Sequence, residues 1–319
     1  QFLSRTIYLS LDPYYRNVMK NSQIYADRLN PGDVMVGETV AQIVESRHPQ
    51  FTVGEYVAVR NGWQQYAVSS GQGVRKLDAS SAPLGAALGV LGMPGLTGYA
   101  GTVYLGQPLP GQTFVVSACT GPVGSTAGQV ARHMGARVVG IAGSDEKCAY
   151  AVKELGFDDC VNYREGDLAE KLRKACPRGI DVYFDNVGGA TLDAVLSLIN
   201  LRARLVICGL ISQYNATAPV PGPQNLGNLL VQRARMEGFI VLDYAPRFPE
   251  AVVGWAQQRD AGLFPAAVDL DALQGPQRAD LLSWFVIQGT GRQASPPSHN
   301  PRRRRKAEAP GQLSLDLSL

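Results

Sequence analysis

The sequence predicts an α/β protein in which a small, mostly antiparallel β domain precedes a larger domain built on a parallel sheet. Up to residue 86, apolar runs such as IYLSLDP and FTVGEYVAV are broken by Gly or Pro-Gly at intervals of about eight to twelve residues, which is typical of short antiparallel strands. From Ala87 onward, β-rich runs alternate with stretches long enough for a helix. That alternation indicates βαβ units around a parallel sheet.

The change of rhythm divides the chain into four segments. We assign residues 1–86 to the first part of the β domain and residues 87–248 to the parallel-sheet domain. Residues 249–293 have a helical pattern in AVVGWAQQ and ADLLSWFVIQG, and we expect them to return to the β domain. Residues 294–319 combine prolines and a basic block with few large apolar side chains, which predicts a disordered tail.

The composition is that of an ordinary globular protein, with 45% hydrophobic and 18% charged residues. No run approaches the roughly 18 apolar residues of a membrane helix, and the start at Gln1 has no signal-peptide pattern. Five scattered cysteines without C-x-x-C spacing indicate reduced thiols, so we expect a cytoplasmic protein. Five Lys or Arg and two Asp or Glu in residues 294–319 account for the whole formal charge of +3. The rest of the chain therefore has no net charge, which does not support binding of a polyanion there.

A glycine cluster follows the first strand of the parallel-sheet domain. Thr113–Ala118 has the pattern of a buried strand, and Ser125–Met134 has that of a helix. Between them, Gly121 and Gly124 predict a tight turn in which the backbone comes close to a pyrophosphate at the helix N-terminus. A second strand, Arg137–Ala142, follows at the spacing of a Rossmann dinucleotide-binding domain. Gly128, one turn into the helix, is expected to let it pack tightly on the strand.

The residues after the second strand indicate which dinucleotide is bound. An NAD site places Asp or Glu at the strand tip to accept from the ribose 2′-hydroxyl group. Here Ser144 occupies the tip and Lys147 follows three residues later, which suits a 2′-phosphate. Asp145 remains an alternative as the NAD-type acid, although it lies in the expected start of a helix. We therefore predict NADPH as the cofactor.

Several motifs together resemble those of a known family. In order they are SLDPYYR, GMPGLTGYAG, GPVGS, GSDEKC, ELGFD with VNY, DVYFDNVGG, CGLISQYN and MEGFIVLDY. This set resembles the zinc-independent medium-chain dehydrogenases/reductases, and within them the prostaglandin reductase (leukotriene B4 12-hydroxydehydrogenase) group and its bacterial relatives. The resemblance implies a GroES-like β domain around a Rossmann domain, with the active site in the cleft between them. It also implies NADPH-dependent reduction of the C=C bond of α,β-unsaturated ketones and aldehydes, such as alkenals or 15-oxo-prostaglandins.

The resemblance also implies a set of site residues. Those expected at the cofactor are Gly121, Pro122, Val123, Gly124, Ser144, Lys147, Tyr163, Asn186, Cys208, Gly209, Leu210, Ile211, Ser212, Gln213, Tyr214, Phe239, Ile240 and Val241. Those expected at the substrate are Val59, Arg60, Tyr214, Val241 and Leu242.

Hydride transfer to the β-carbon of an enone would build negative charge on the carbonyl oxygen, where hydrogen-bond donors act most strongly. The candidate donors are the Tyr214 hydroxyl group, predicted to be catalytic, and a ribose hydroxyl of the cofactor. Alternatively, Tyr214 only packs at the domain boundary with its hydroxyl group tied to the backbone. We expect Tyr14 and Tyr15 to organise the β domain, with a place in the cleft lining as the alternative, and we expect Cys208 not to be a nucleophile.

No metal is expected. The three histidines, His48, His133 and His299, have no ligand spacing, and Gly37-Glu38 stands where zinc enzymes of this superfamily carry Gly-His-Glu. Conjugate reduction does not need a Lewis acid.

The sequence departs from the family pattern at both ends. A segment that normally precedes SLDPYYR is missing, Gly289 stands where the family has a cofactor-contacting Asn, and the final strand is replaced by the tail. We therefore weigh an alternative, a protein that binds NADPH without catalysis. PRRRRK and QLSLDL in the tail suggest a further, less favoured alternative, contact with nucleic acid or a bacterial sliding clamp. The resemblance leaves a homodimer, through the sheet edge near residues 200–235, or a monomer.

Overall fold

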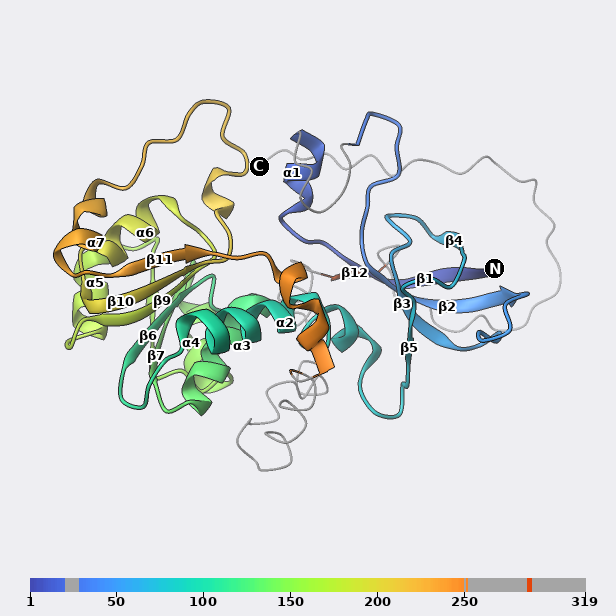
Figure 1. Cartoon of the computed structure of the whole chain (residues 1–319), viewed down its shortest axis with the longest axis horizontal. Coiled ribbons are helices and arrows are strands. Elements are labelled where there is room, and N and C mark those ends of the chain that lie inside the picture. The colour runs from blue at the N-terminus through green and yellow to red at the C-terminus, as the bar shows by residue number, and fades with distance from the viewer. Residues whose placement is uncertain (21–28, 250, 252–285, 289–319) are drawn as a thin grey trace.

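Two sheets organise the described part of the chain, and Figure 1 shows them at opposite ends of the molecule's long axis. The structure is a computed structural model that describes residues 1–20, 29–249, 251 and 286–288. One sheet is antiparallel and the other is entirely parallel. The predicted α/β class, with a β domain and a Rossmann domain, is confirmed.

The antiparallel sheet has the strand order β12-β1-β2-β3-β5, and β4 also pairs with β1. Its hydrophobic core gathers side chains such as Phe2, Ile43 and Phe51 on one side. The helix α1 follows β1. The bounds are β1 Phe2–Ser10, α1 Tyr15–Lys20, β2 Thr39–Ser46, β3 Tyr56–Val59, β4 Tyr66–Ser69, β5 Arg75–Leu77 and β12 Val286–Gln288.

The strand β12 corrects part of the sequence analysis. The pattern of ADLLSWFVIQG predicted a helix, but its residues Val286–Gln288 pair antiparallel with Tyr8–Ser10 of β1. A short apolar run fits either a strand or a buried helix by its periodicity, and here the unpaired edge of β1 offers hydrogen-bond partners. The rest of that predicted helix, Gly289 and the predicted tail lie outside the described residues.

The parallel sheet has the order β11-β10-β9-β6-β7-β8, so its strand order reverses between β6 and β9. Open parallel sheets bind ligands outside the carboxyl ends of their strands at such a switch point. The strands are β6 Thr113–Ser117, β7 Arg137–Ala142, β8 Asp159–Asn162, β9 Ile180–Asp185, β10 Ile199–Ile207 and β11 Arg235–Gly238. The α-helices are α2 Met93–Ala100, α3 Pro122–His133, α4 Asp145–Lys153, α5 Leu168–Ala175, α6 Gly189–Leu196 and α7 Asn228–Val231.

Helices cover both faces of the parallel sheet, which explains why its central strands are apolar throughout. Phe114 and Val116 face a core that includes Ala127 of α3, whereas Val115 faces a second core that includes Leu172 of α5. Figure 1 shows α2 between the two sheets. None of the helices in the described residues is long and apolar enough to cross a membrane.

The helix α3 is held close to its neighbours by a glycine. It begins at Pro122, earlier than the predicted Ser125, because proline is favoured in the first helical turn. A Cβ atom added to Gly128 would lie 2.1 Å from Phe157, which is itself buried. The sequence analysis expected Gly128 to pack on the strand, but its close contact is with the Phe157 ring, which lies between α4 and β8.

We predict that Gly128→Ala destabilises the protein by about 1–3 kcal/mol, because the new methyl group overpacks the contact with Phe157. The matched control is Gly227→Ala, since Gly227 also has a negative φ of −57° and open space around its Cβ position. Urea unfolding of both variants measures the difference. Equal midpoints for the two variants would contradict the packing role.

Candidate active site

The turn between β6 and α3 is shaped to hold a phosphate group. Gly121 precedes the first turn of α3, and no side chain among the described residues caps that turn, so the leading N–H groups of the helix are available to an anion. A Cβ atom on Gly124 would lie 2.4 Å from the carbonyl oxygen of Ala118. Only glycine lets the backbone approach so closely there. The structure thus places Gly121, Pro122, Val123 and Gly124 in one cradle.

The residues predicted at the 2′-phosphate, Ser144, Lys147 and Tyr163, lie near one another at the ends of β7 and β8. The Ser144 Oγ atom accepts a hydrogen bond from the Lys147 N–H group at 3.3 Å and caps α4. The Tyr163 ring packs over Gly143, whose Cβ position lies 3.2 Å from the phenolic oxygen. Asp145 accepts a hydrogen bond from Asn162 at 2.9 Å. Its carboxylate is thus engaged with β8, which weakens the alternative of an NAD-type acid.

Asp185 organises the loop at the end of β9 and was missed by the sequence analysis. Its side chain is fully buried, and Oδ1 accepts hydrogen bonds from four donors. These donors are the Tyr183 hydroxyl group at 2.8 Å, the Ser117 hydroxyl group at 3.1 Å, and the N–H groups of Val187 and Gly188 at 2.9 Å each. Burial raises the pKa of this carboxyl group, although the four donors oppose the rise.

The Asp185 network fixes Asn186, a predicted cofactor residue. The Asn186 N–H group donates to Ser117 Oγ at 2.9 Å, and its Nδ2 donates to the Ser117 carbonyl oxygen at 2.8 Å. The carbonyl oxygen of Asp185 accepts from the N–H groups of Cys208 and Gly209 at 2.8 and 3.0 Å. The ends of β6, β9 and β10 are therefore tied together at the point where the strand order of the sheet reverses.

The segment Cys208–Tyr214 folds against that loop. The Ile211 N–H group donates to the carbonyl oxygen of Asn186, and the Ser212 hydroxyl group donates to that of Val187 at 2.6 Å. Leu210 and Gln213 pack beside Gly188, where a Cβ atom would collide with Leu210. This segment and the loop after β9 thus form one wall of the site.

The hydroxyl group of Tyr214 is tied to the backbone, as the alternative reading expected, and its catalytic role stays a prediction. Its phenolic oxygen accepts a hydrogen bond from the Leu210 N–H group at 3.3 Å, so it is tied to the backbone. An accepted bond leaves the hydroxyl proton to be donated elsewhere. Burial raises the pKa of Tyr214, which keeps it protonated at neutral pH. Burial also raises the pKa of the Cys208 thiol to about 12, so this cysteine is a poor nucleophile.

The residues after β11 divide between the core and the surface. Phe239 packs edge-on against Phe184 and Tyr244. Val241 is 5% exposed and packs with Leu96 and Val130, so its side chain belongs to a core cluster. Leu242 is 45% exposed, and Ile240 lies between Phe239 and Val241 in the chain.

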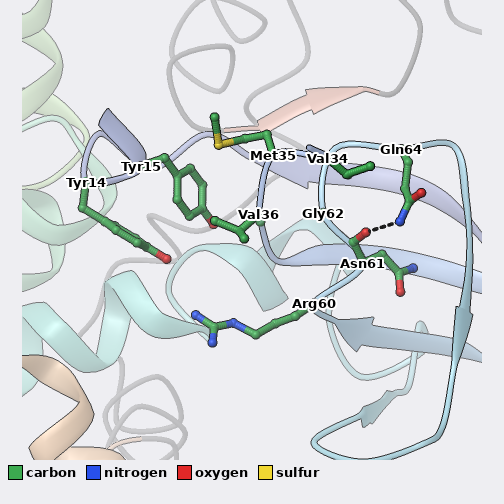
Figure 2. Close-up of a pocket in the computed structure, with 10 residues that line it drawn as sticks. Tyr14, Tyr15, Val34, Met35, Val36, Arg60, Asn61, Gly62 and Gln64 are labelled. Atoms are coloured by element: carbon green, nitrogen blue, oxygen red, sulfur yellow. Dashed lines mark hydrogen bonds between the residues drawn. The ribbon is translucent and has the colours of Figure 1, made fainter. Parts of the chain in front are cut away.

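A cavity of about 220 Å³ lies in the β domain (Figure 2). Tyr14 and Arg60 extend toward the same side of it, and Arg60 is the one charged residue of its lining in the part of the chain that the structure describes. Tyr14 and Tyr15 therefore both organise the β domain and line the cavity. Val59, predicted beside Arg60 at the substrate, packs instead in the β-domain core. The other lining residues are Val34, Met35, Val36, Gly37, Asn61, Gly62 and Gln64.

Two half-buried acids, Asp12 and Glu38, lie close in sequence to the lining residues Tyr14 and Gly37. Burial raises the pKa of Asp12, opposed by hydrogen bonds from Ser10 and Tyr15 and by the charge of Arg60. Burial also raises the pKa of Glu38, opposed most strongly by Arg75. The Tyr15 hydroxyl oxygen accepts from the Glu38 N–H group at 3.3 Å. The β-domain wall is therefore a polar, hydrogen-bonded surface.

The site fits NADPH on the evidence of its own residues. The uncapped α3 turn, the Gly124 approach and the Ser144–Lys147 pair lie in sequence order along the carboxyl ends of β6 and β7, as a dinucleotide requires. Across the residues that the structure describes, no group of three or more His, Cys, Asp or Glu side chains could hold a metal ion. The absence of a metal stays a prediction.

Comparison with known protein families supports this description. Residues 122–258 match the family model of the zinc-binding dehydrogenases, and residues 1–77 match the N-terminal domain of oxidoreductases. The chain belongs to the medium-chain dehydrogenase/reductase family.

Individual relatives define the branch within that family. The chain is 49% identical over 255 residues to the NADPH-dependent curcumin reductase of Escherichia coli strain K12, covering 78% of this chain and 74% of that protein. It is 45% identical over 245 residues to rat prostaglandin reductase 1, covering 76% and 72%. Among solved structures, CurA of Vibrio vulnificus in complex with NADPH has a TM-score of 0.77 at 46% identity, covering 82% of this chain and 80% of that one. The resemblance inferred from the motifs is confirmed.

We predict that Asp185→Ala lowers the free energy of unfolding by about 2–4 kcal/mol, because four buried donors lose their acceptor. It should also weaken NADPH binding, since Asn186 loses its fixed position. Asp185→Asn keeps an oxygen acceptor and serves as the matched control. Urea unfolding and NADPH fluorescence titration measure both effects, and wild-type values for Asp185→Ala would contradict the role.

Proposed function

We propose that the protein is an NADPH-dependent oxidoreductase that reduces the C=C bond of α,β-unsaturated ketones and aldehydes without a metal. The observation that carries the proposal is the wall built by Asp185, Asn186 and Cys208–Tyr214 beside the phosphate cradle. This arrangement would put the reactive end of a dinucleotide opposite the β domain. The names of the relatives, curcumin reductase and prostaglandin reductase 1, support an enone as substrate.

The bound cofactor would supply the hydride for the β-carbon of the enone. The protein would bind and orient the enone and the cofactor and would supply a proton. Negative charge that develops on the carbonyl oxygen needs a donor, and the Tyr214 hydroxyl group retains one proton for this purpose. The two tyrosines of the opposite wall, Tyr14 and Tyr15, keep their protons because burial raises the pKa of each. Arg60 adds a positive charge at the cavity.

The test is the loss of NADPH absorbance with purified protein and a panel of 2-alkenals and 15-oxo-prostaglandins, run beside NADH. Enone-dependent oxidation of NADPH, much weaker with NADH, is the expected outcome. Binding of NADPH without turnover would favour the alternative of a non-catalytic cofactor-binding protein. Failure to bind either cofactor would contradict the proposed role of the Gly121–Gly124 cradle.

A homodimer is the favoured assembly within this proposal. The edge strand β11 is exposed along its length, and Leu230 and Val231 of the adjacent α7 are 83% and 61% exposed. Unpaired edges and clustered apolar side chains are typical of protein interfaces. Sedimentation velocity distinguishes a dimer from a monomer.

We also propose a cytoplasmic location. The thiols of Cys148 and Cys160 lie 2.8 Å apart without a disulfide bond, and the five cysteines are all free. Unpaired thiols at this distance are compatible with a reducing compartment.

We predict that Lys147→Ala raises the KM for NADPH about 10- to 100-fold and leaves the KM for NADH nearly unchanged, because only the 2′-phosphate uses the charge. Lys153→Ala, a change of an exposed lysine on the same helix, is the matched control. Steady-state kinetics with both cofactors measure the effect. Equal losses with NADPH and NADH would show that Lys147 does not read the phosphate.

We predict that Tyr214→Phe lowers kcat for enones about 100-fold, because the transition state loses a donor at the carbonyl oxygen. The NADPH dissociation constant should change less than about twofold, as the ring and its packing remain. Tyr150→Phe, another half-buried tyrosine of the Rossmann domain, is the control. If kcat is unchanged, Tyr214 has only its backbone-binding role.

A further inference from the structure

A hydrogen bond joins the two domains beside the candidate site. The Nε–H group of Arg16 donates to Oδ1 of Asn215 at 2.8 Å. Arg16 lies on α1 of the β domain, whereas Asn215 directly follows Tyr214 in the Rossmann domain, 199 residues later in the chain. Both side chains are exposed, so water competes for the bond and it can open reversibly.

On the β-domain side, Arg16 projects from a firmly held turn. Its N–H group donates to the carbonyl oxygen of Pro13, and the N–H group of Tyr15 donates to that of Asp12. Tyr15 is 4% exposed and packs against Trp63 and Tyr14. The position of the Arg16 backbone is therefore fixed relative to the cavity that Tyr14 lines.

On the Rossmann side, Asn215 directly follows Cys208–Tyr214, the segment that forms one wall of the site. Tyr214 donates its N–H group to the carbonyl oxygen of Ile211, and Ser212 is bonded twice to that of Val187. A restraint on Asn215 therefore reaches Tyr214 and the loop after β9 through a few short hydrogen bonds.

We propose that Arg16 is a positioning residue that, through Asn215, holds the Cys208–Asn215 segment at a fixed distance from the Tyr14–Arg60 cavity. The bond restrains the mouth of the cleft, so it slows the release of NADPH and keeps the Tyr214 hydroxyl group facing the substrate. This inference rests on the proposed function for its catalytic part. The part that concerns cofactor release does not depend on turnover.

A double-mutant cycle tests the bond. Arg16→Met keeps the aliphatic stem and removes the donor, and Asn215→Ala removes the acceptor. Each change should speed NADPH dissociation about three- to tenfold, measured by stopped-flow fluorescence with NADP⁺ as the competitor. The double variant should be no faster than either single variant, because both changes break the same bond.

Two further variants sharpen the test. Asn215→Asp keeps an oxygen acceptor for Arg16 and should release NADPH at the wild-type rate or more slowly. Arg5→Met removes a positive charge from an exposed position on β1, and a wild-type release rate there excludes a general effect of charge on the anionic cofactor. Single-turnover reduction of an enone should slow in Arg16→Met and Asn215→Ala alike.

The outcomes separate this inference from the proposed function. Additive effects of Arg16→Met and Asn215→Ala on NADPH release, or no effect of either, would overturn the positioning role. Wild-type protein that binds NADPH but reduces no enone would contradict the proposed function. The release rates would still decide whether the Arg16–Asn215 bond restrains the cleft.

Discussion

The structure of the candidate site depends on one buried carboxylate. Asp185 sits where the strand order reverses, and its Oδ1 atom accepts from donors on β6, on β9 and in the loop after β9. Removing a carboxylate from water is costly unless donors replace the lost hydration. Here four donors do so at Oδ1, whereas the buried Oδ2 atom has no hydrogen-bond partner among the described residues, and the network fixes Ser117 and Asn186. This wall of the site is therefore held by hydrogen bonds within the protein itself.

The phosphate end of the site could be predicted from sequence because its signals are local. The β6 strand, the glycine turn and α3 lie within 21 residues, and the backbone geometry of each part explains the residue types found there. Ser144 and Lys147 are neighbours on one helical turn. The hydrogen-bond network around Asp185 was not predicted, since one of its donors, Ser117, lies 68 residues away in the chain. A signal was nevertheless present in DVYFDNVGG, where an acid ends a buried strand just before a turn.

Strand geometry explains why two residues predicted at the substrate, Val59 and Arg60, lie in different surroundings. Successive side chains of a strand point to opposite faces, and Val59 points inward as the last residue of β3, whereas Arg60 lies beyond the end of that strand. Val59 ends β3 in the core, and Arg60 follows it at the cavity. The same reasoning does not reach Val241, whose burial against Leu96 and Val130 depends on how distant helices pack. Nor could it find the Arg16–Asn215 bond, which joins residues 199 positions apart.

Three acids, the buried Asp185 and the half-buried Asp12 and Glu38, give the molecule a definite response to pH. Burial raises the native pKa of Asp12, Glu38 and Asp185 above the ordinary values of 3.8, 4.5 and 3.8. The native state then holds these protons more tightly than the unfolded chain, so the free energy of unfolding falls as pH rises from those values through the raised pKa values. The positive charges of Arg60 and Arg75 limit the rise for the two β-domain acids. At Asp185 the opposition comes from hydrogen-bond donors alone, so this wall is held by geometry, whereas the β-domain wall is held partly by charge and is the more sensitive to salt.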